Sequence, residues 1–146
     1  MIVLDTTVLA YAAGSDHPLR APAQQLLVQA AWLRATTTVE VIQEFAHVHA
    51  RRRPRATVAR LAEAYVDVLR PLLVVSEPTV RAGLALFEQH ERLGAFDCVL
   101  AAAAIERAAT LVSADRAFAG VTGLEVVVPD AAGVARLLES RPPSQS

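Results

Sequence analysis

The amino-acid sequence predicts a single α/β domain, built as a sandwich around a mostly parallel sheet. Short apolar runs, which are typical of buried strands, alternate with longer amphipathic stretches of helical spacing along the whole chain. The 146 residues suit one domain, and a hydrophobic content of 53% supplies ample material for its core. No internal repeat, low-complexity tract or linker divides this pattern, so we expect one folding unit.

The first predicted strand spans residues 2–4 and leads directly into Asp5. In open α/β sheets, ligands bind beside the carboxyl ends of the strands, so Asp5 stands where a ligand is expected. The alternative is that Asp5 only caps the helix that follows, predicted over residues 7–13. The placement of the later acidic residues bears on this choice.

Proline, glycine and capping residues mark the other element boundaries. Asp16 or His17, followed by Pro18, is expected near the N-cap of a long helix. Thr37 and Glu40 have the spacing of a capping box for the next helix. The elements expected after the first strand are helices 7–13 and 19–32, a strand at 34–36, helices 39–48 and 56–69, a strand at 72–75, helices 76–90 and 96–105, a strand at 111–112, a helical turn at 116–118, a strand at 124–128 and a helix at 130–138.

Charge and cysteine content indicate a soluble, cytoplasmic protein. The net charge is −1, so any contact with nucleic acid must come from a local basic patch. All 14 basic residues are arginine. The single cysteine, Cys98, cannot form an internal disulfide, which fits a reducing cytosol. No secretion signal is visible, and no apolar run reaches the roughly 18 residues of a membrane span, so we expect no membrane association.

Acidic residues recur at positions where a parallel sheet would bring them together. Asp5 and Asp115 each follow an apolar strand, so both would reach the same sheet edge if these strands are neighbours. Asp97 lies in the first turn of a helix that is apolar on almost every side, which is typical of a buried helix. Glu44 lies in mid-helix beside the apolar Phe45.

Each acid also has a purely structural interpretation. Asp97 could complement a helix dipole, Asp115 could cap a turn and Glu44 could be solvated. Together these interpretations are strained, because two carboxylates about 4 Å apart repel by roughly 4 kcal/mol at an effective dielectric near 20. No lysine is available to neutralise them. One or two divalent cations are the natural counter-charge, and oxygen ligands favour Mg²⁺ or Mn²⁺. Such a site suits phosphodiester hydrolysis.

Other catalytic arrangements are weakly supported. The sequence offers no Ser/His/Asp or Cys/His nucleophile pattern and no Walker-type phosphate loop. Cys98 falls inside the apolar helix and is expected to be inert core. His47 and His49 follow Glu44 and could be zinc ligands, but they have no cysteines or second histidine pair beside them.

The basic residues cluster once, around Pro54. This cluster could engage RNA phosphates, since arginine suits bidentate phosphate contacts. It could equally be a solvated helix end that complements the C-terminal dipole. The cluster consists of Arg51, Arg52, Arg53 and Arg55.

Four motifs follow one another in order over nearly the whole chain: Ile2-Val3-Leu4-Asp5-Thr6, Val41-Ile42-Gln43-Glu44-Phe45, Phe96-Asp97-Cys98-Val99-Leu100-Ala101-Ala102-Ala103 and Leu111-Val112-Ser113-Ala114-Asp115-Arg116-Ala117-Phe118. In this order and spacing they resemble the PIN-domain ribonucleases, and among these the small VapC-type toxins of bacterial toxin–antitoxin pairs. No single motif is specific, whereas the ordered set is.

The resemblance implies a three-layer α/β/α fold, with a mostly parallel central sheet of about four to five strands. It implies a PIN domain over residues 1–140 and a frayed tail at 141–146. The implied activity is Mg²⁺- or Mn²⁺-dependent endoribonuclease cleavage of a cellular RNA. The implied partners are a small antitoxin that occludes the site and a second copy of the chain. The implied catalytic and metal-binding residues are Asp5, Glu44, Asp97 and Asp115, supported by the hydroxyls of Thr6 and Ser113.

Three alternatives stay open. Glu40 lies one helical turn before Glu44 and could share or replace its role. A haloacid-dehalogenase-like phosphatase would use Asp5 as its nucleophile, although Thr7 occupies the place of that family's second aspartate and no lysine is present. A degenerate PIN module could bind RNA or act as a scaffold without catalysis.

Overall fold

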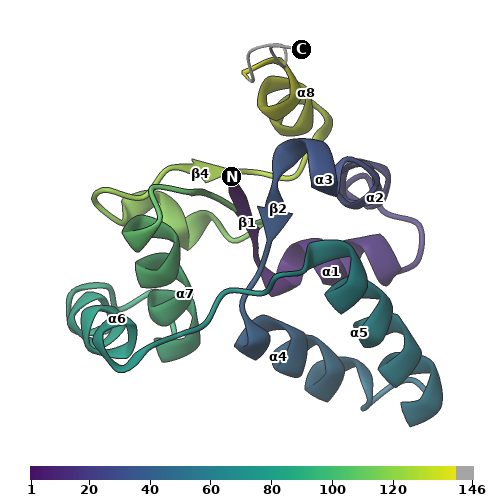
Figure 1. Ribbon diagram of the computed structural model, residues 1–146, viewed down its shortest axis with the longest axis horizontal. Helices are drawn as coiled ribbons and strands as arrows, with labels where there is room; N and C mark the ends of the chain where they lie inside the picture. The colour runs from purple at the N-terminus through teal and green to yellow at the C-terminus, as the bar shows by residue number, and fades with distance from the viewer. Residues whose placement is uncertain (141–146) are drawn as a thin grey trace.

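The computed structural model describes residues 1–140 (Figure 1). Its centre is a four-stranded sheet in the order β2-β1-β3-β4, and every pairing is parallel. The strands are β1 (Ile2–Leu4), β2 (Ala35–Thr36), β3 (Thr110–Val112) and β4 (Val126–Val127). The helices are α1 (Thr6–Ala13), α2 (Arg20–Val28), α3 (Ala30–Leu33), α4 (Val39–His49), α5 (Arg55–Leu69), α6 (Glu77–Gln89), α7 (Ala95–Glu106) and α8 (Ala131–Glu139), with a 3-10 helix, η1, at Arg116–Gly120.

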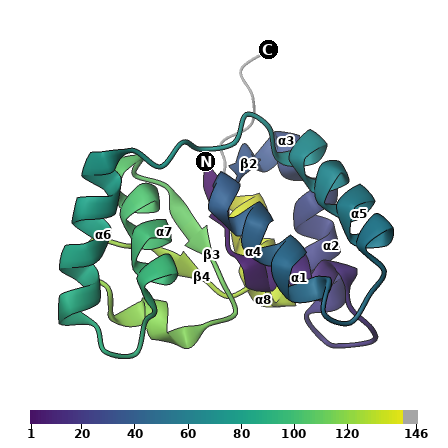
Figure 2. The same ribbon diagram turned by 90° about the horizontal axis from the view of Figure 1, so that it is seen from below.

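Helices cover both sides of this sheet, which confirms the predicted three-layer arrangement. The pair α6 and α7 lies on one side, and α1, α4 and α5 lie on the other (Figure 2). All three residues of β1 are buried, as expected for a central strand with helices on both faces. No helix within residues 1–140 combines the length and apolar character needed to span a membrane.

The pairing of β1 with β3 aligns the two strand ends that precede the acidic residues. Leu4 lies opposite Val112 in the register. The pairing continues one residue further, because the Asp5 N–H donates to the Val112 carbonyl at 3.0 Å. The prediction that these strands are parallel neighbours is therefore confirmed, and Asp5 and Ser113 emerge side by side at the same edge.

The prediction of a strand at residues 72–75 is wrong. Only one bridge forms there, between Leu73 and Thr38, with the Leu73 N–H donating to the Thr37 carbonyl at 2.8 Å. The neighbouring Val74 is 72% exposed, so this apolar run has no sheet to enter. Residues 72–75 instead form a linking segment between α5 and α6.

The long helix predicted over residues 19–32 divides into α2 and α3 at Gln29. Its N-cap is Leu19 rather than Asp16 or His17. The His17 ring instead accepts a hydrogen bond from the Leu19 N–H at 3.1 Å, which holds the turn before the helix. Arg34 is left-handed, with φ of 51°, and lies outside β2. The predicted tail at 141–146 lies outside the described residues.

The capping box expected between Thr37 and Glu40 does not form. Thr38 caps α4 by accepting from the Val41 N–H at 3.3 Å. The buried Thr37 hydroxyl donates instead to the Leu4 carbonyl at 2.7 Å, which ties the start of α4 to the end of β1. The chain therefore enters α4 one residue later than the spacing suggested.

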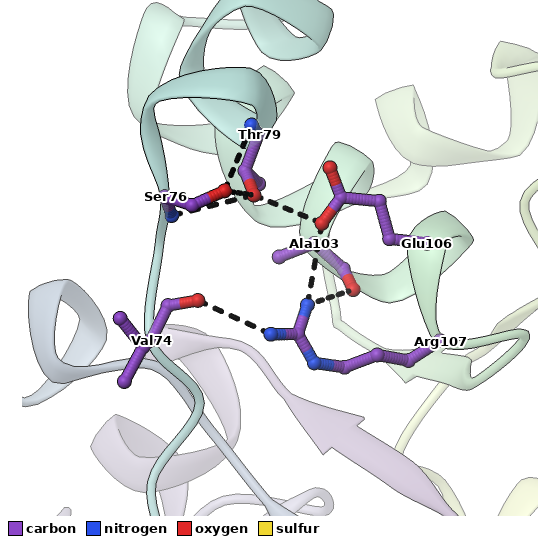
Figure 3. Close-up of polar contacts among 6 residues, drawn as sticks. All are labelled: Val74, Ser76, Thr79, Ala103, Glu106 and Arg107. Carbon is purple, nitrogen blue, oxygen red and sulfur yellow. Dashed lines mark hydrogen bonds and ion pairs between the residues drawn. The ribbon is translucent and has the colours of Figure 1, made fainter.

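Close packing and a polar network hold α6 against α7. A Cβ on Gly83 would lie 2.6 Å from Val99 Cγ2, so only glycine permits this approach. Thr79 donates to Glu106 at 2.9 Å, joining the start of α6 to the end of α7 (Figure 3). The Arg107 guanidinium donates to the Val74 carbonyl at 3.1 Å, which fastens the linking segment to the same helix.

Candidate active site

Asp5 is the most enclosed of the predicted site residues, at 4% exposure. Its Oδ1 accepts from the Thr6 N–H at 2.7 Å, so it does cap α1. Its Oδ2 accepts from the Thr7 hydroxyl at 2.9 Å and from the Ser113 hydroxyl at 2.6 Å. Capping and a place at the sheet edge are thus compatible, and these three hydrogen bonds hold the Asp5 carboxylate in one orientation.

Hydroxyl groups connect this carboxylate to the loop after β3. The Ser113 oxygen also accepts from the Asp115 N–H at 3.0 Å, and the Thr7 oxygen accepts from the Ala114 N–H at 3.0 Å. Sequence reasoning named Ser113 but missed Thr7. A local signal was available, because Thr7 lies two residues after Asp5 at the start of a helix, where a hydroxyl commonly forms a local hydrogen bond.

Glu44 is held by the other predicted hydroxyl. The Thr6 hydroxyl donates to Glu44 Oε2, so Thr6 supports Glu44 while its backbone supports Asp5. This contact joins the first turn of α1 to the middle of α4. Glu44 is half-buried and therefore does not lie on a solvated helix face.

Asp97 is less firmly held and strongly affected by charge. Its only carboxylate hydrogen bond among the described residues is with the Gly94 N–H at 3.3 Å, which closes the first turn of α7. Burial, followed by the negative charge of Asp5, raises the pKa of Asp97 from 3.8 to about 6. The charges of Glu44 and Asp115 raise this pKa further, whereas the Gly94 N–H lowers it. The charges of three acids from distant parts of the chain therefore all reach Asp97.

Asp115 is exposed and caps η1 through the Ala117 N–H, which donates to Oδ1 at 2.9 Å. The capping alternative foreseen from the sequence is thus realised, while the charge of Asp115 still reaches Asp97. Asp115 is therefore the exposed member of the four acids, whereas Asp5 is the buried one.

Three of the four acids open into one cavity of about 270 Å³. Asp5, Glu44 and Asp97 line it together with Glu40, whose Oε2 is shielded from solvent without a hydrogen-bond partner in residues 1–140. The remaining lining is mostly apolar and comes from α4, α6, α7 and the segment before α6: Val41, Val75, Val80, Leu84, Ala95, Phe96, Val99 and Leu100, with Thr38.

The donor chemistry of this cluster fits a hard divalent cation. Carboxylate and hydroxyl oxygens surround the site, and mutual repulsion at Asp97 would be relieved by positive charge. Within the described chain, however, no three His, Cys, Asp or Glu side chains stand in an arrangement that already forms a ligand cage. The cluster is a set of oxygen donors grouped around Asp97, and Asp5 is the one most completely oriented.

The histidines and the cysteine have other surroundings. His49 Nδ1 lies 3.0 Å from the Phe45 carbonyl and its ring stacks on Phe45, while His47 Nε2 lies 3.3 Å from an Arg51 nitrogen. Cys98 is fully buried, and burial raises the pKa of its thiol. These contacts favour a structural role for all three residues.

The arginine cluster lies in the turn between α4 and α5, outside the lining of the acidic cavity. Arg53 donates to the Ala13 carbonyl at 2.9 Å, so it fastens this turn to the end of α1. Arg51, Arg52 and Arg55 are exposed. The structure therefore separates one structural arginine from three that are open to a ligand.

Comparison with known proteins assigns the family. The PIN domain family model matches residues 2–124, and the chain therefore belongs to the PIN-domain family. Within it, the chain is 51% identical to Ribonuclease VapC7 of Mycobacterium tuberculosis over 145 residues, which is 97% of this chain and 100% of that protein. It is 32% identical to Ribonuclease VapC23 of the same species over 114 residues, or 77% of this chain and 90% of that protein.

Solved structures share the fold at low sequence identity. FitAcB from Neisseria gonorrhoeae matches with a TM-score of 0.73 and 17% identity, over 88% of this chain and 98% of the matched chain. VapBC2 from Rickettsia felis, bound to a promoter DNA fragment, gives 0.68 and 19%, with the same two coverages. A toxin–antitoxin complex from Klebsiella pneumoniae gives 0.67 and 19%, again with those coverages. The predicted fold class is thus confirmed, and the dehalogenase-like alternative loses its basis.

Proposed function

We propose that the protein is a metal-dependent endoribonuclease, the toxin of a toxin–antitoxin pair. The observation that carries this proposal is the convergence of three other carboxylates on Asp97 at the carboxyl edge of a parallel sheet. The names of the two mycobacterial ribonucleases that this chain resembles support the reaction class.

Mg²⁺ or Mn²⁺, when bound, would activate a water molecule and stabilise negative charge on the phosphate. Asp5 and Asp97 would be the principal ligands, and Glu44 and Asp115 would complete the set. Thr7 and Ser113 hold the Asp5 carboxylate in position, so little reorganisation is needed there. Asp97 must be deprotonated to bind a cation, so its raised pKa makes binding weaken toward acidic pH.

The acidic cavity would repel the negatively charged RNA backbone, so binding needs positively charged side chains elsewhere on the surface. We assign that role to the exposed Arg51, Arg52 and Arg55 at the far end of α4 from Glu40. Arg53, engaged with Ala13, would contribute mainly by holding the turn.

The proposed protein partners are a small antitoxin and a second copy of the chain. The acidic cavity has apolar walls and no basic residue in its lining, so an antitoxin segment that combines a basic with an apolar side chain would fit and block it. An antitoxin partner is supported by the fold shared with the toxin–antitoxin complex from Klebsiella pneumoniae. We place the activity in the cytoplasm, where a cellular RNA is accessible.

The test is cleavage of structured RNA by the purified chain with Mg²⁺, with Mn²⁺ and with EDTA. Either metal should support cleavage, and EDTA should stop it. Asp5→Asn should lower the rate by roughly 100-fold or more, because it removes a ligand charge. Asp16→Asn is the matched control, since Asp16 is exposed and lies outside the cavity lining.

Cleavage that persists in EDTA would refute the metal mechanism. Tight RNA binding without turnover in any metal would favour the degenerate module instead. Growth arrest on induced expression, relieved by co-expression of the neighbouring small open reading frame, tests the toxin assignment separately.

A further inference from the structure

Phe96 is an aromatic side chain left open beside the candidate catalytic acids. It is 67% exposed, although phenylalanine is normally among the more buried residue types. It immediately precedes Asp97 in the first turn of α7 and lines the same cavity. Val80 and Leu84 on α6 line this cavity as well. The cavity therefore has an apolar part directly next to its acidic part.

Glu40 supplies a polar group to the same cavity. Its Oε2 is buried without a hydrogen-bond partner among the described residues, which is costly unless a ligand provides a donor. Glu44, by contrast, accepts from Thr6. Glu40 lies one helical turn before Glu44 on α4 and lines the same cavity as Asp5, Glu44 and Asp97.

The covalent structure of RNA connects these two parts of the cavity. A phosphate held at Asp5 and Asp97 brings its ribose and base with it, and consecutive residues lie only about 3.8 Å apart along the chain, so Phe96 is within reach of that nucleoside. Unpaired bases in RNA are commonly stacked on aromatic side chains and read along their Watson–Crick edges.

We propose that Phe96 and Glu40 form a subsite for an unpaired guanine next to the scissile phosphate. Phe96 stacks on the base, and the Glu40 carboxylate accepts from its N1–H and N2–H₂ groups. A carboxylate offers only acceptors, and guanine is the one standard base with two adjacent donors on its Watson–Crick edge. This subsite deepens the proposed ribonuclease function and rests on it.

A basic, apolar peptide is the other class of occupant that this cavity could take. The nucleobase is favoured because the subsite is continuous with the acids that would hold the phosphate, so a substrate bound for cleavage has to place a nucleoside there. A peptide, in contrast, would not depend on the donor pattern of a base. Substrates that differ in a single donor group therefore separate the two.

The experiment uses short single-stranded RNAs that differ only at one position beside the cleaved bond, where they carry guanine, inosine, adenine or uracil. Inosine keeps N1–H and lacks the N2 amino group. The wild-type chain should prefer guanine, with kcat/KM for inosine about tenfold lower, since a hydrogen bond to a charged group is lost. Glu40→Gln should bring the guanine-to-inosine ratio close to one.

Phe96→Leu should lower kcat/KM by roughly 5- to 150-fold on every substrate, because stacking on an aromatic ring is lost. Phe96→Tyr should retain the wild-type rate. Phe87→Leu and Glu63→Gln are matched controls, since both residues are exposed and outside the cavity lining, and both should behave as wild type.

Binding of the same RNAs, followed by fluorescence anisotropy with Ca²⁺ in place of Mg²⁺, separates the two proposals. Guanine-selective binding that requires Glu40, without cleavage in any metal, would overturn the ribonuclease and retain the subsite. Cleavage with no base preference, or with a preference unchanged by both substitutions, would overturn the subsite alone. Variants that lose affinity only for the antitoxin would likewise overturn it, in favour of a protein-binding groove.

Discussion

Asp5 and Asp97 face the same cavity, yet the fold treats them in opposite ways. Asp5 is 4% exposed and accepts three hydrogen bonds, two of them from hydroxyl groups. Asp97 is half-buried, accepts one hydrogen bond at 3.3 Å and is repelled by three other carboxylates. The protein therefore stabilises the negative charge of Asp5 with hydrogen bonds and leaves the negative charge of Asp97 largely uncompensated.

This difference follows from the elements that bear the two residues. Asp5 continues a central strand, and its neighbours are set by the pairing of β1 with β3. Asp97 stands in the first turn of α7, a helix outside the sheet that packs closely against α6. The sheet edge therefore holds Asp5 in one orientation, whereas Asp97 on the helical side has a single, longer hydrogen bond and a raised pKa.

The largest expected effect is a loss of stability on removing the Asp5 side chain, and it tests the contrast between Asp5 and Asp97. Asp5→Ala should lower the free energy of unfolding by about 2–4 kcal/mol, because it removes a helix cap and leaves the buried Ser113 hydroxyl and the half-buried Thr7 hydroxyl without their acceptor. Asp97→Ala should cost no more than about 0.5 kcal/mol in metal-free buffer, since lost repulsion offsets the lost turn contact. Urea unfolding in EDTA at neutral pH measures both.

Asp16→Ala serves as the control, because Asp16 is an exposed acid outside the cavity lining. Equal losses for Asp5→Ala and Asp97→Ala would contradict the asymmetry between the two residues.

The same asymmetry explains how far the sequence could predict the site. Asp5 and Asp115 were predictable because parallel neighbouring strands bring their carboxyl ends to one edge, whereas the supporting role of Ser113 was implied by the resemblance to the PIN-domain ribonucleases. Thr7 was missed because its contact with the Ala114 N–H, 107 residues away in sequence, depends on the register of those strands. Local pattern carries no information on register between strands so distant in sequence.

The helical side of the site was harder to predict. Phe96 was expected within an apolar, buried helix, but it is 67% exposed. Residues 72–75 have the composition of a strand, but whether a neighbouring strand is free to pair with them is a tertiary property. Thr37 likewise lost its expected capping role to the Leu4 carbonyl.

A smaller effect is expected at Gly83, and it tests whether the position of Asp97 depends on the packing of α6 against α7. Gly83→Ala should lower the free energy of unfolding by about 1–3 kcal/mol, because the added Cβ would press on Val99. RNA cleavage should fall as well, since α7 bears Asp97 and would have to shift. Urea unfolding and a cleavage assay below the unfolding transition measure the two effects.

Gly120→Ala is the matched control, because nothing lies within 4 Å of a Cβ placed there. Wild-type stability in Gly83→Ala would mean that α6 and α7 can separate without cost, and the Asp97 side of the site would then be less defined than proposed.

The smallest effect is a pH dependence that isolates the Asp97 charge. Its pKa is raised from 3.8 to about 6 in the fold, so between these values the folded state binds more protons than the unfolded state. Stability of the metal-free protein therefore falls as pH rises from about 4 to about 6, by on the order of 1 kcal/mol after allowance for solvent screening. Above that range the penalty is fully present.

The difference between wild type and Asp97→Asn measures this contribution, because other groups that titrate in the same range are common to both. The wild-type free energy of unfolding should decline relative to that of Asp97→Asn across this range, whereas Asp16→Asn should follow the wild type. Saturating Mg²⁺ at neutral pH should raise wild-type stability more than that of Asp97→Asn, since the ion supplies the positive charge that the fold withholds. Parallel pH profiles for wild type and Asp97→Asn would mean that Asp97 is not repelled by its neighbours, and the need for a cation at this site would disappear with that repulsion.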